Sequence, residues 1–350
     1  MSLRPICLVS ALLAACGTNR SSTAKASFNI VDLGPMLPSG INNSDEIVGS
    51  LGDSTFHPVY WKAGVMTALK GSTGARDTAN AINDAGQIAG HVSGSADGET
   101  AQAVLWESST AAPTTLTAPS GVSDIFTDAL GLDAGGNAVG YGFDQNIIQR
   151  AIVWKHGAAA VALKGLSSST GDAAWALNGS GEIVGTSAFQ SQKSEQISWA
   201  INQPSVAQDL SVAVTTASTT HVDTALIPVF VNAAGIVVGT QQGTGGVGLA
   251  YVRTAGGTVT SITAADPTQS QATGINTGGT VILDLNPDNV GATQSAAIYD
   301  TTHGLRLLDS LVTPSSGWKL QFATGINDAG KIVGFGQFQG ATHGFLLTPN

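Results

Sequence analysis

The sequence predicts an all-β protein, a seven-bladed β-propeller closed by pairing of its N-terminal strand with the last blade. Three observations support this fold. A turn motif occurs seven times, and its copies lie 41 to 54 residues apart, as expected of four-stranded blades. Only 11% of the residues are charged and 44 are Gly, a composition that does not favour ion-paired helices. An extra strand precedes the first motif, and one strand is missing after the last.

The clearest copy of the motif is Ala81–Gly90, which reads as a strand end, a tight turn and a strand start. Asn83 begins the turn, where its side chain can bond to the backbone two residues on. Gly86, in the fourth position, suits a type I turn followed by a bulge, and Gly90 allows a neighbouring backbone to approach closely. We call the first turn residue the anchor. The anchors are Asn42, Asn83, Asp133, Asn178, Asn232, Asn276 and Asn327.

Two more strand patterns recur between the anchors. One is a short apolar strand whose last residue is expected to pack between adjacent blades; these residues are Trp61, Trp106, Trp154, Trp199, Tyr251, Tyr299 and Leu347. The other strand ends in Leu or Ile, and a copy at Phe28–Leu33 precedes the first anchor. With the strands of a blade labelled A to D from the centre outwards, the chain begins with D and ends after C. The first strand therefore completes the last blade and leaves no open edge.

The turns resemble a group of extracellular repeats, the HAF family. The segments that carry the resemblance are Ile41-Asn42-Asn43, Ile82–Gly86, Ile326–Gly330 and Val31–Gly34. The His-Ala-Phe tripeptide that names the family is altered here, to His57-Pro58-Val59 and His343-Gly344-Phe345. The resemblance covers roughly residues 28–350 and implies an extracellular or envelope protein. It brings no agreed activity and no catalytic residues.

Residues 1–16 are expected to form a bacterial lipoprotein signal. Arg4 supplies a positive charge, and the apolar run Ile6–Leu13 is too short to cross a bilayer as a helix. Leu13-Ala14-Ala15-Cys16 resembles a lipobox, with small residues before the cysteine. We therefore expect cleavage before Cys16 and lipidation of this residue, with a plain signal peptide as the alternative.

The residue after the cysteine and the polar segment beyond it complete the expected address. Gly17 stands where an Asp would hold a lipoprotein at the inner membrane, so resemblance to bacterial lipoproteins favours the outer membrane. The protein would face the periplasm or the cell surface. Residues 17–27 form a polar tether, and residues 28–350 form the propeller domain.

Charge and cysteine content narrow the expected partners. The formal net charge is −10 with no cluster of Lys or Arg, which argues against nucleic acid and against electrostatic binding to anionic lipid. Membrane attachment would then rest on the acyl anchor alone. The two cysteines, Cys7 and Cys16, both lie in the signal segment, so no disulfide is expected in the domain. We expect a monomer.

Loop lengths predict where a ligand binds. The A–B turns are nearly constant, whereas the B–C and D–A loops vary, and both kinds of variable loop emerge on one face of a propeller. Two aromatic residues outside the repeated patterns belong to this face. Trp175 is expected to begin the inner strand of the fourth blade, and Trp318 to lie in the last D–A loop. Either residue could stack on a sugar or grip a protein, or could simply fill space between blades.

Sequence motifs for nucleotide binding, metal binding or catalysis are weak in this chain. Gly243–Gly248 matches a dinucleotide-binding pattern but is flanked by strands, and so is expected to be a loop. Asp284–Asn289 has the oxygen spacing of a calcium loop without its Gly and Glu, and the six His are scattered. We predict no metal site and no cofactor. The acidic residues of the variable loops are interpreted as solvated charges: Asp77, Asp97, Glu99, Asp124, Asp128, Asp172, Asp223 and Asp266.

The combined expectation is an envelope-anchored, non-enzymatic binding or scaffolding module that recognises a glycan or a protein on the D–A/B–C face. The alternative is a polysaccharide lyase or hydrolase with carboxylates at the mouth of the central channel. Two or three titratable side chains converging at that mouth would favour the enzyme.

Overall fold

The computed structural model describes residues 27–52, 57–71, 76–93, 100–190, 194–210, 229–242, 248–262, 269–286 and 294–350. Cys16 and nearly all of the expected tether lie outside these ranges. Within them the protein is all-β apart from two short 3-10 helices, η2 (Leu308–Leu311) and η3 (Pro314–Ser316). No helix in the described part of the chain has the length and apolar character needed to cross a bilayer.

The strands form five four-stranded sheets and one eight-stranded sheet. The four-stranded sheets consist of β2 (Met36–Ile41), β3 (Ile47–Leu51), β4 (Pro58–Lys62) and β5 (Val65–Ala68); β14 (Gly171–Leu177), β15 (Glu182–Ala188), β16 (Ser194–Ala200) and β17 (Gln203–Asp209); β18 (Phe230–Val231), β19 (Val237–Gln242), β20 (Gly248–Arg253) and β21 (Val259–Ser261); β22 (Ser270–Ile275), β23 (Val281–Leu285), β24 (Ser295–Asp300) and β25 (Gly304–Leu307); and β26 (Trp318–Ile326), β27 (Ile332–Phe338), β28 (Ala341–Pro349) and β1 (Phe28–Asp32).

The eight-stranded sheet contains two copies of the turn motif. Its strands are β6 (Thr78–Ile82), β7 (Ile88–Ser93), β8 (Ala101–Trp106), β9 (Pro113–Thr115), β10 (Ser123–Leu132), β11 (Ala138–Phe143), β12 (Gln149–Trp154) and β13 (Val161–Ala162). Within each copy the strands pair antiparallel. The two copies are joined by one parallel pair between β10 and β8, Phe126 with Ala101.

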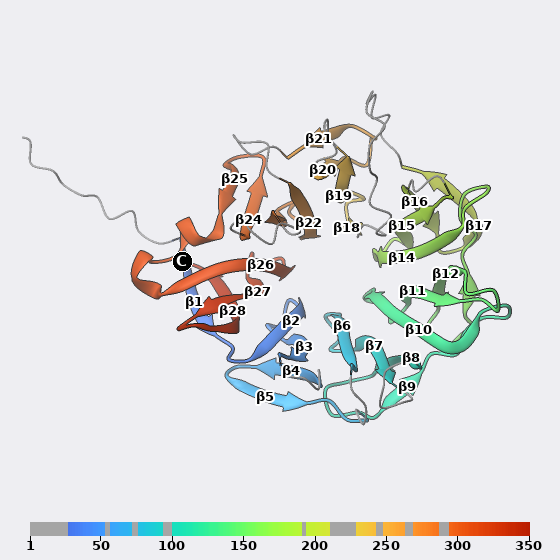
Figure 1. Cartoon of the computed structure of the whole chain (residues 1–350), viewed down its shortest axis with the longest axis horizontal. Helices are drawn as coiled ribbons and strands as arrows, with labels where there is room; N and C mark the ends of the chain where they lie inside the picture. The colour runs from blue at the N-terminus through green and yellow to red at the C-terminus, as the bar shows by residue number, and fades with distance from the viewer. Residues whose placement is uncertain are drawn as a thin grey trace, which may run out of the picture.

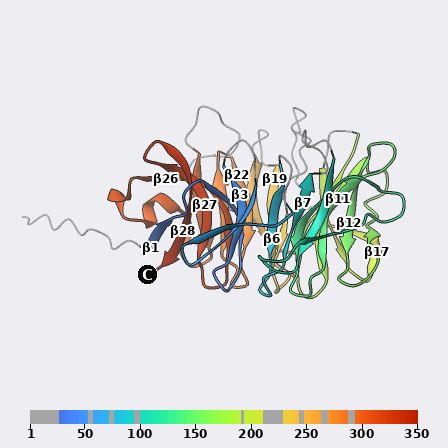
Figure 2. The same cartoon turned by 90° about the horizontal axis from the view of Figure 1, so that it is seen from below.

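The sheets are arranged in a propeller-like ring, with β2, β6, β10, β14, β18, β22 and β26 nearest the centre (Figure 1). Seen from the side, the inner strands run along the short axis of the ring (Figure 2). The N-terminal strand β1 pairs antiparallel with β28, from Phe28 opposite Pro349 to Asp32 opposite Phe345. The expected completion of the last sheet by the first strand is therefore confirmed, and β26 and β27 of that sheet contact β2.

The repeated aromatic residues pack in the core, as predicted. Trp106 and Trp199 are fully buried, and their indole N–H groups donate to the backbone carbonyls of Lys70 (2.9 Å) and Lys164 (2.8 Å). Trp154 makes the same kind of bond to the carbonyl of Thr117 at 3.0 Å. Because each carbonyl follows an outer strand, the indoles both fill the core and satisfy backbone groups there.

The inner strands share one irregularity that accounts for a repeated glycine. The ladder between the two innermost strands shifts register three residues before the anchor; the residues skipped there are Ser39, Asn80, Leu130, Trp175, Thr273 and Thr324. On the second strand of one copy, a Cβ atom added at Gly90 would overlap the carbonyl oxygen of Thr78. The expected close backbone approach at Gly90 is confirmed, and the β-bulge explains it.

Candidate functional site

The anchor turns have the predicted geometry. In the turn that follows β6, Asn83 Oδ1 accepts hydrogen bonds from the backbone N–H groups of Ala85 (3.1 Å) and Gln87 (3.0 Å). Gly86 has a φ of 80° and donates its N–H to the carbonyl of Asn83 at 3.0 Å. In the first copy Asp45 takes the left-handed position, with a φ of 62°. The turn therefore uses the acceptor atom of the anchor amide. One N–H of Asn83 Nδ2 donates within the turn to Gln87 Oε1 at 2.8 Å, which leaves the other N–H available.

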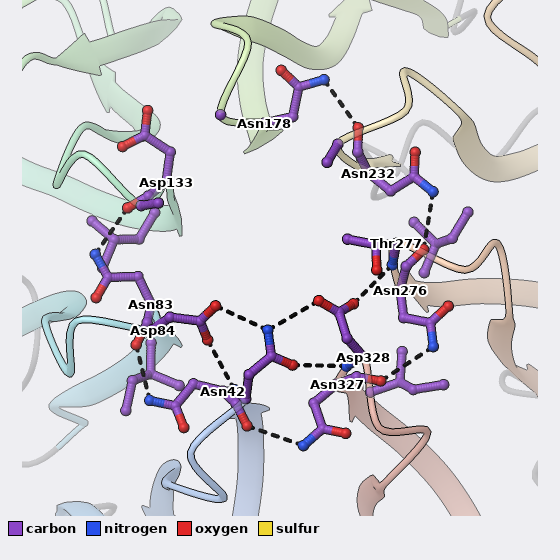
Figure 3. A pocket seen from close by; sticks show the side chains of 18 of the residues that line it. Asn42, Asn83, Asp84, Asp133, Asn178, Asn232, Asn276, Thr277, Asn327 and Asp328 are labelled. Atoms are coloured by element: carbon purple, nitrogen blue, oxygen red, sulfur yellow. Dashed lines mark hydrogen bonds between the residues drawn. The ribbon is translucent and has the colours of Figure 1, made fainter.

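The remaining N–H groups of the anchor amides link the turns to one another around the centre of the molecule (Figure 3). Each Asn anchor donates its Nδ2 to the backbone carbonyl of the next anchor, and Asn327 donates to Asn42, across the join between the last and first sheets. The six bonds span 2.9 to 3.2 Å and run from Asn42 to Asn83, Asn83 to Asp133, Asn178 to Asn232, Asn232 to Asn276, Asn276 to Asn327 and Asn327 to Asn42. We call this arrangement the anchor ring.

The anchor ring is open at one place, between Asp133 and Asn178. A carboxylate has no N–H to donate. Asp133 instead accepts bonds from the backbone of Gly135 (2.9 Å) and Asn137 (2.8 Å) and from the side chain of Asn137 (2.8 Å). One sheet-to-sheet bond of the ring is therefore absent at Asp133, and a carboxylate is placed at the ring.

The anchor ring surrounds a cavity of about 230 Å³ at the A–B end of the central channel. Asn43 lines this cavity and donates from Nδ2 to Asp84 (2.9 Å) and Asp328 (3.0 Å), so that these two carboxylates converge. Asp84 and Asp328 are labelled in Figure 3. Partial burial opposes ionisation of Asp328, but hydrogen bonds from Thr277 and Asn43 hold its pKa below the ordinary value. The described residues that line the cavity include three carboxylates, with Asp133 as the third, and no Lys, Arg or His.

The structure does not bring Trp175 and Trp318 together, and it corrects both expected positions. Trp175 is the fifth residue of β14 rather than its first, is half-buried, and donates from Nε1 to Thr186 Oγ1 at 3.1 Å. Trp318 is the first residue of β26 rather than part of a loop, and it pairs with Phe338. β14 begins four residues before Trp175, at Gly171, and β26 begins at Trp318, so the inner strands extend beyond the repeated pattern and the sequence places their starts too late.

Three acidic residues expected to be solvated are buried instead. Asp77, Asp128 and Asp172 are 0%, 7% and 2% exposed, whereas Asp124 is exposed as predicted. Each buried carboxylate accepts hydrogen bonds: Asp77 from the backbone of Ser93, Asp128 from Asn80 and Asp172 from Ser187. Asp97, Glu99, Asp223 and Asp266 lie outside the described residues.

The segment with calcium-like oxygen spacing, for which no metal site was predicted, begins inside a strand. Asp284 lies inside β23, is 6% exposed, and accepts a bond from the backbone N–H of Ala323 in β26 at 2.9 Å. Burial raises its pKa to about 7, against the opposing effect of that bond. Asp288 and most of Gly243–Gly248 are outside the described residues. Among the described residues there is no group of three His, Cys, Asp or Glu that could hold a metal ion.

Sequence reasoning missed a second set of buried polar residues on, or directly before, the inner strands. They lie six residues before an anchor: Asp77, Thr127, Asp172 and Ser270. Thr127 Oγ1 and Ser270 Oγ each accept a backbone N–H from the third strand of the preceding motif copy, at 2.9 Å. Their common distance from the anchor is a signal that the sequence does contain.

Comparison with known proteins identifies the fold alone. No family model matches the chain, and no curated protein matches it. Among solved structures it is similar to puromycin hydrolase (TM-score 0.58, 12% identity, 89% of this chain and 51% of that one). It is also similar to a prolyl endopeptidase structure (TM-score 0.56, 9% identity, 80% and 42%) and to a chain of the mitotic checkpoint complex (TM-score 0.50, 14% identity, 97% and 98%). The chain thus spans about half the length of the two hydrolases, and what it shares with these proteins is an all-β, propeller-like architecture.

Proposed function

We propose that the protein is an envelope-anchored, non-enzymatic binding or scaffolding module built on a seven-bladed propeller. The seven-bladed arrangement is supported by the eight-stranded sheet, because the strand ladder joins its two motif copies by one residue pair only among the described residues. The envelope location is supported by the Leu13–Cys16 lipobox and by the HAF-like turns. On this proposal the acyl chain on Cys16 is the only contact with the membrane.

The observation that carries the binding proposal is an aromatic group at the D–A/B–C end of the last sheet. Trp318 stacks on Phe338, with ring centroids 4.7 Å apart and an interplanar angle of 12°. His343 stands edge-on to Phe338 at 5.7 Å and contacts Asp32 Oδ1 through Nδ1 at 2.9 Å. The three rings are half-buried. Half-exposed aromatic rings beside a polar pair suit a sugar or a protein side chain, so we propose a glycan or a surface protein as the partner.

A hydrolase or lyase is the second candidate, and one observation favours it. Asp84 and Asp328 converge on Asn43 in the lining of the cavity, and paired carboxylates are the usual catalytic groups of glycoside hydrolysis. A general acid needs a raised pKa, however, whereas the pKa of Asp328 is lowered. We therefore place binding ahead of catalysis. We propose neither a metal nor a cofactor for this cavity.

The binding proposal is tested by a thermal-shift screen of the purified chain against envelope and environmental polysaccharides, followed by calorimetry on any hit. We expect Trp318→Leu to weaken binding at least tenfold. Phe322→Leu removes another half-buried ring from the same strand and should leave binding unchanged. Trp175→Leu tests whether Trp175, the second residue expected to contact the ligand, takes part in binding. If no polysaccharide raises the melting temperature, or both β26 variants lose binding equally, the glycan proposal is rejected.

The proposed anchor has a separate test. Cells that express the chain are labelled with a radioactive or alkyne-bearing fatty acid, and the protein is then recovered from the membrane and soluble fractions. We expect label and membrane recovery to disappear together in Cys16→Ser and to be retained in Cys7→Ser. Label retained in Cys16→Ser would contradict the proposal.

A further inference from the structure

His91, on β7, has an acceptor at each ring nitrogen. Nδ1 lies 2.9 Å from Oδ1 of Asp128 on β10, and Nε2 lies 2.8 Å from the backbone carbonyl oxygen of Arg76. A third group, Thr78 Oγ1 on β6, is 3.0 Å from Nδ1. The side chains of His91 and Asp128 are only 12% and 10% exposed, so water competes little for these contacts.

The chemistry of these partners determines how many protons the imidazole holds. A carbonyl and a carboxylate only accept, so both contacts are hydrogen bonds only when both ring nitrogens carry protons. In a neutral ring, the Arg76 carbonyl keeps the proton on Nε2 and turns the Nδ1 lone pair towards the Asp128 carboxylate. The Thr78 hydroxyl can then donate to Nδ1. Protonation therefore chooses between two partners that are both in place.

The His91–Asp128 contact joins the two motif copies of the eight-stranded sheet. Asp128 lies two residues beyond Phe126, which pairs with Ala101 in the single parallel contact between these copies. Oδ1 of Asp128 also accepts from Nδ2 of Asn80 at 2.8 Å. If the His91 contact is lost, the Asn80 amide is the remaining side chain among the described residues that hydrogen-bonds Asp128 from the preceding motif copy.

We propose that His91 is a proton-operated latch between the two motif copies: the imidazolium ties β7 to Asp128, and the neutral ring is held by Thr78 and releases it. This latch is distinct from the proposed binding function and from the anchor ring. The contact between β8 and β10, which we call the seam, is therefore more stable in acid and less stable in base.

The charges around the ring favour the imidazolium. Burial lowers the pKa of His91, but the bond and charge of Asp128, the carbonyl of Arg76 and the charge of Asp77 outweigh it and raise the pKa above 6.5. Asp77 is fully buried and Arg76 is exposed. On β11, burial and the charge of Asp128 raise the pKa of Tyr141 to about 12, so its phenol stays neutral. The stabilisation is complete below pH 6.5 and is lost as the pH rises through the pKa of His91.

The first test is an NMR titration of the full chain with ¹³C- and ¹⁵N-labelled histidine. We expect His91 to titrate above 6.5, with both ring nitrogens protonated below that pH. Asp128→Asn should lower the His91 pKa by at least one unit, because it removes the anion. Thr78→Val should raise it, because it removes the donor to the neutral ring. A histidine that only fills space would not show these opposite shifts, and half-exposed His156 serves as the internal control in each spectrum.

The second test measures the stability of the contact between β8 and β10 by backbone hydrogen exchange of residues 123–132. After correction for the intrinsic rate, we expect protection to fall at least fivefold as the pH rises through the His91 pKa in the native chain. In His91→Gln protection should not depend on pH. The proposal is overturned if His91 titrates below 6.5, if both variants shift its pKa in the same direction, or if native protection does not change. The native titration and Thr78→Val suffice should His91→Gln fail to fold.

Discussion

Asp284 provides the sharpest test of how burial sets stability in this fold. Its carboxyl lies on β23 between two sheets and accepts one backbone bond, from Ala323 of the next sheet. Burial raises its pKa from 3.8 to about 7. Asp284→Asn keeps an oxygen that can accept the Ala323 bond and removes the charge. We therefore expect the substitution to stabilise the protein at alkaline pH and to have little effect in acid.

The size of this effect follows from proton linkage. Between pH 3.8 and about 7 the folded chain holds a proton on Asp284 that the unfolded chain has lost, so stability falls as the pH rises through this window. At ~1.4 kcal/mol for each pKa unit, the cost at pH 8 is about 4 kcal/mol. This figure is an upper limit, because the surrounding chain relaxes around a buried charge.

Urea unfolding of the native chain and of Asp284→Asn at pH 4, 6 and 8 checks the prediction. We expect the two midpoints to agree at pH 4 and the variant to be more stable by several kcal/mol at pH 8. Asp124→Asn is the matched control, since Asp124 is exposed and accepts a backbone bond from Ala118 at 3.0 Å. A stability difference for Asp284→Asn that is the same at pH 4 and pH 8 would refute the reasoning.

Two further pairs of substitutions test the anchor ring and the close packing of the inner strands. Asn276→Ala removes a buried ring bond and the turn acceptor, and should lower the free energy of unfolding by about 2 kcal/mol. Asp133→Asn should close the ring and raise the free energy of unfolding by up to about 1 kcal/mol. Chemical denaturation measures both variants, and a loss of stability in Asp133→Asn would show that the local bonds of Asp133 matter more than the ring bond. Gly165→Ala would drive a methyl group into the buried carboxylate of Asp172, and should lower the free energy of unfolding by at least about 2 kcal/mol. In Gly179→Ala the added methyl group meets nothing within 4 Å, so the melting temperature should change little. Equal melting temperatures for the two variants would contradict the packing argument.

The repeated turn could be predicted in detail because its chemistry is local. The Asn side chain that bonds its own backbone and the left-handed fourth residue both follow from residues within five positions of each other, and the structure has both. The aromatic residues of the core could also be predicted, because an apolar strand that recurs in each repeat is expected to bury one face. Trp106 and Trp199 are the clearest examples.

The candidate site was less predictable because its contacts join residues from separate turns. The bonds from Asn43 to Asp84 and Asp328 connect positions 41 and 285 residues apart, and nothing in either turn alone indicates them. Asp77 and Asp172 were taken for solvated charges because polar residues before a strand are usually exposed. In the structure Asp172 lies on β14 and Asp77 directly precedes β6, and both are buried.

The sequence by itself determined the strand order, the turn type and the residues of the core, because each depends on the properties of neighbouring residues or on the repeat. Only the tertiary structure decided which polar groups meet. It turned the spare N–H groups of six anchors into a ring, left that ring open at Asp133, and set His91 against Asp128. These contacts depend on the curvature that brings separate sheets around a common centre, a property of the whole ring that no single repeat contains.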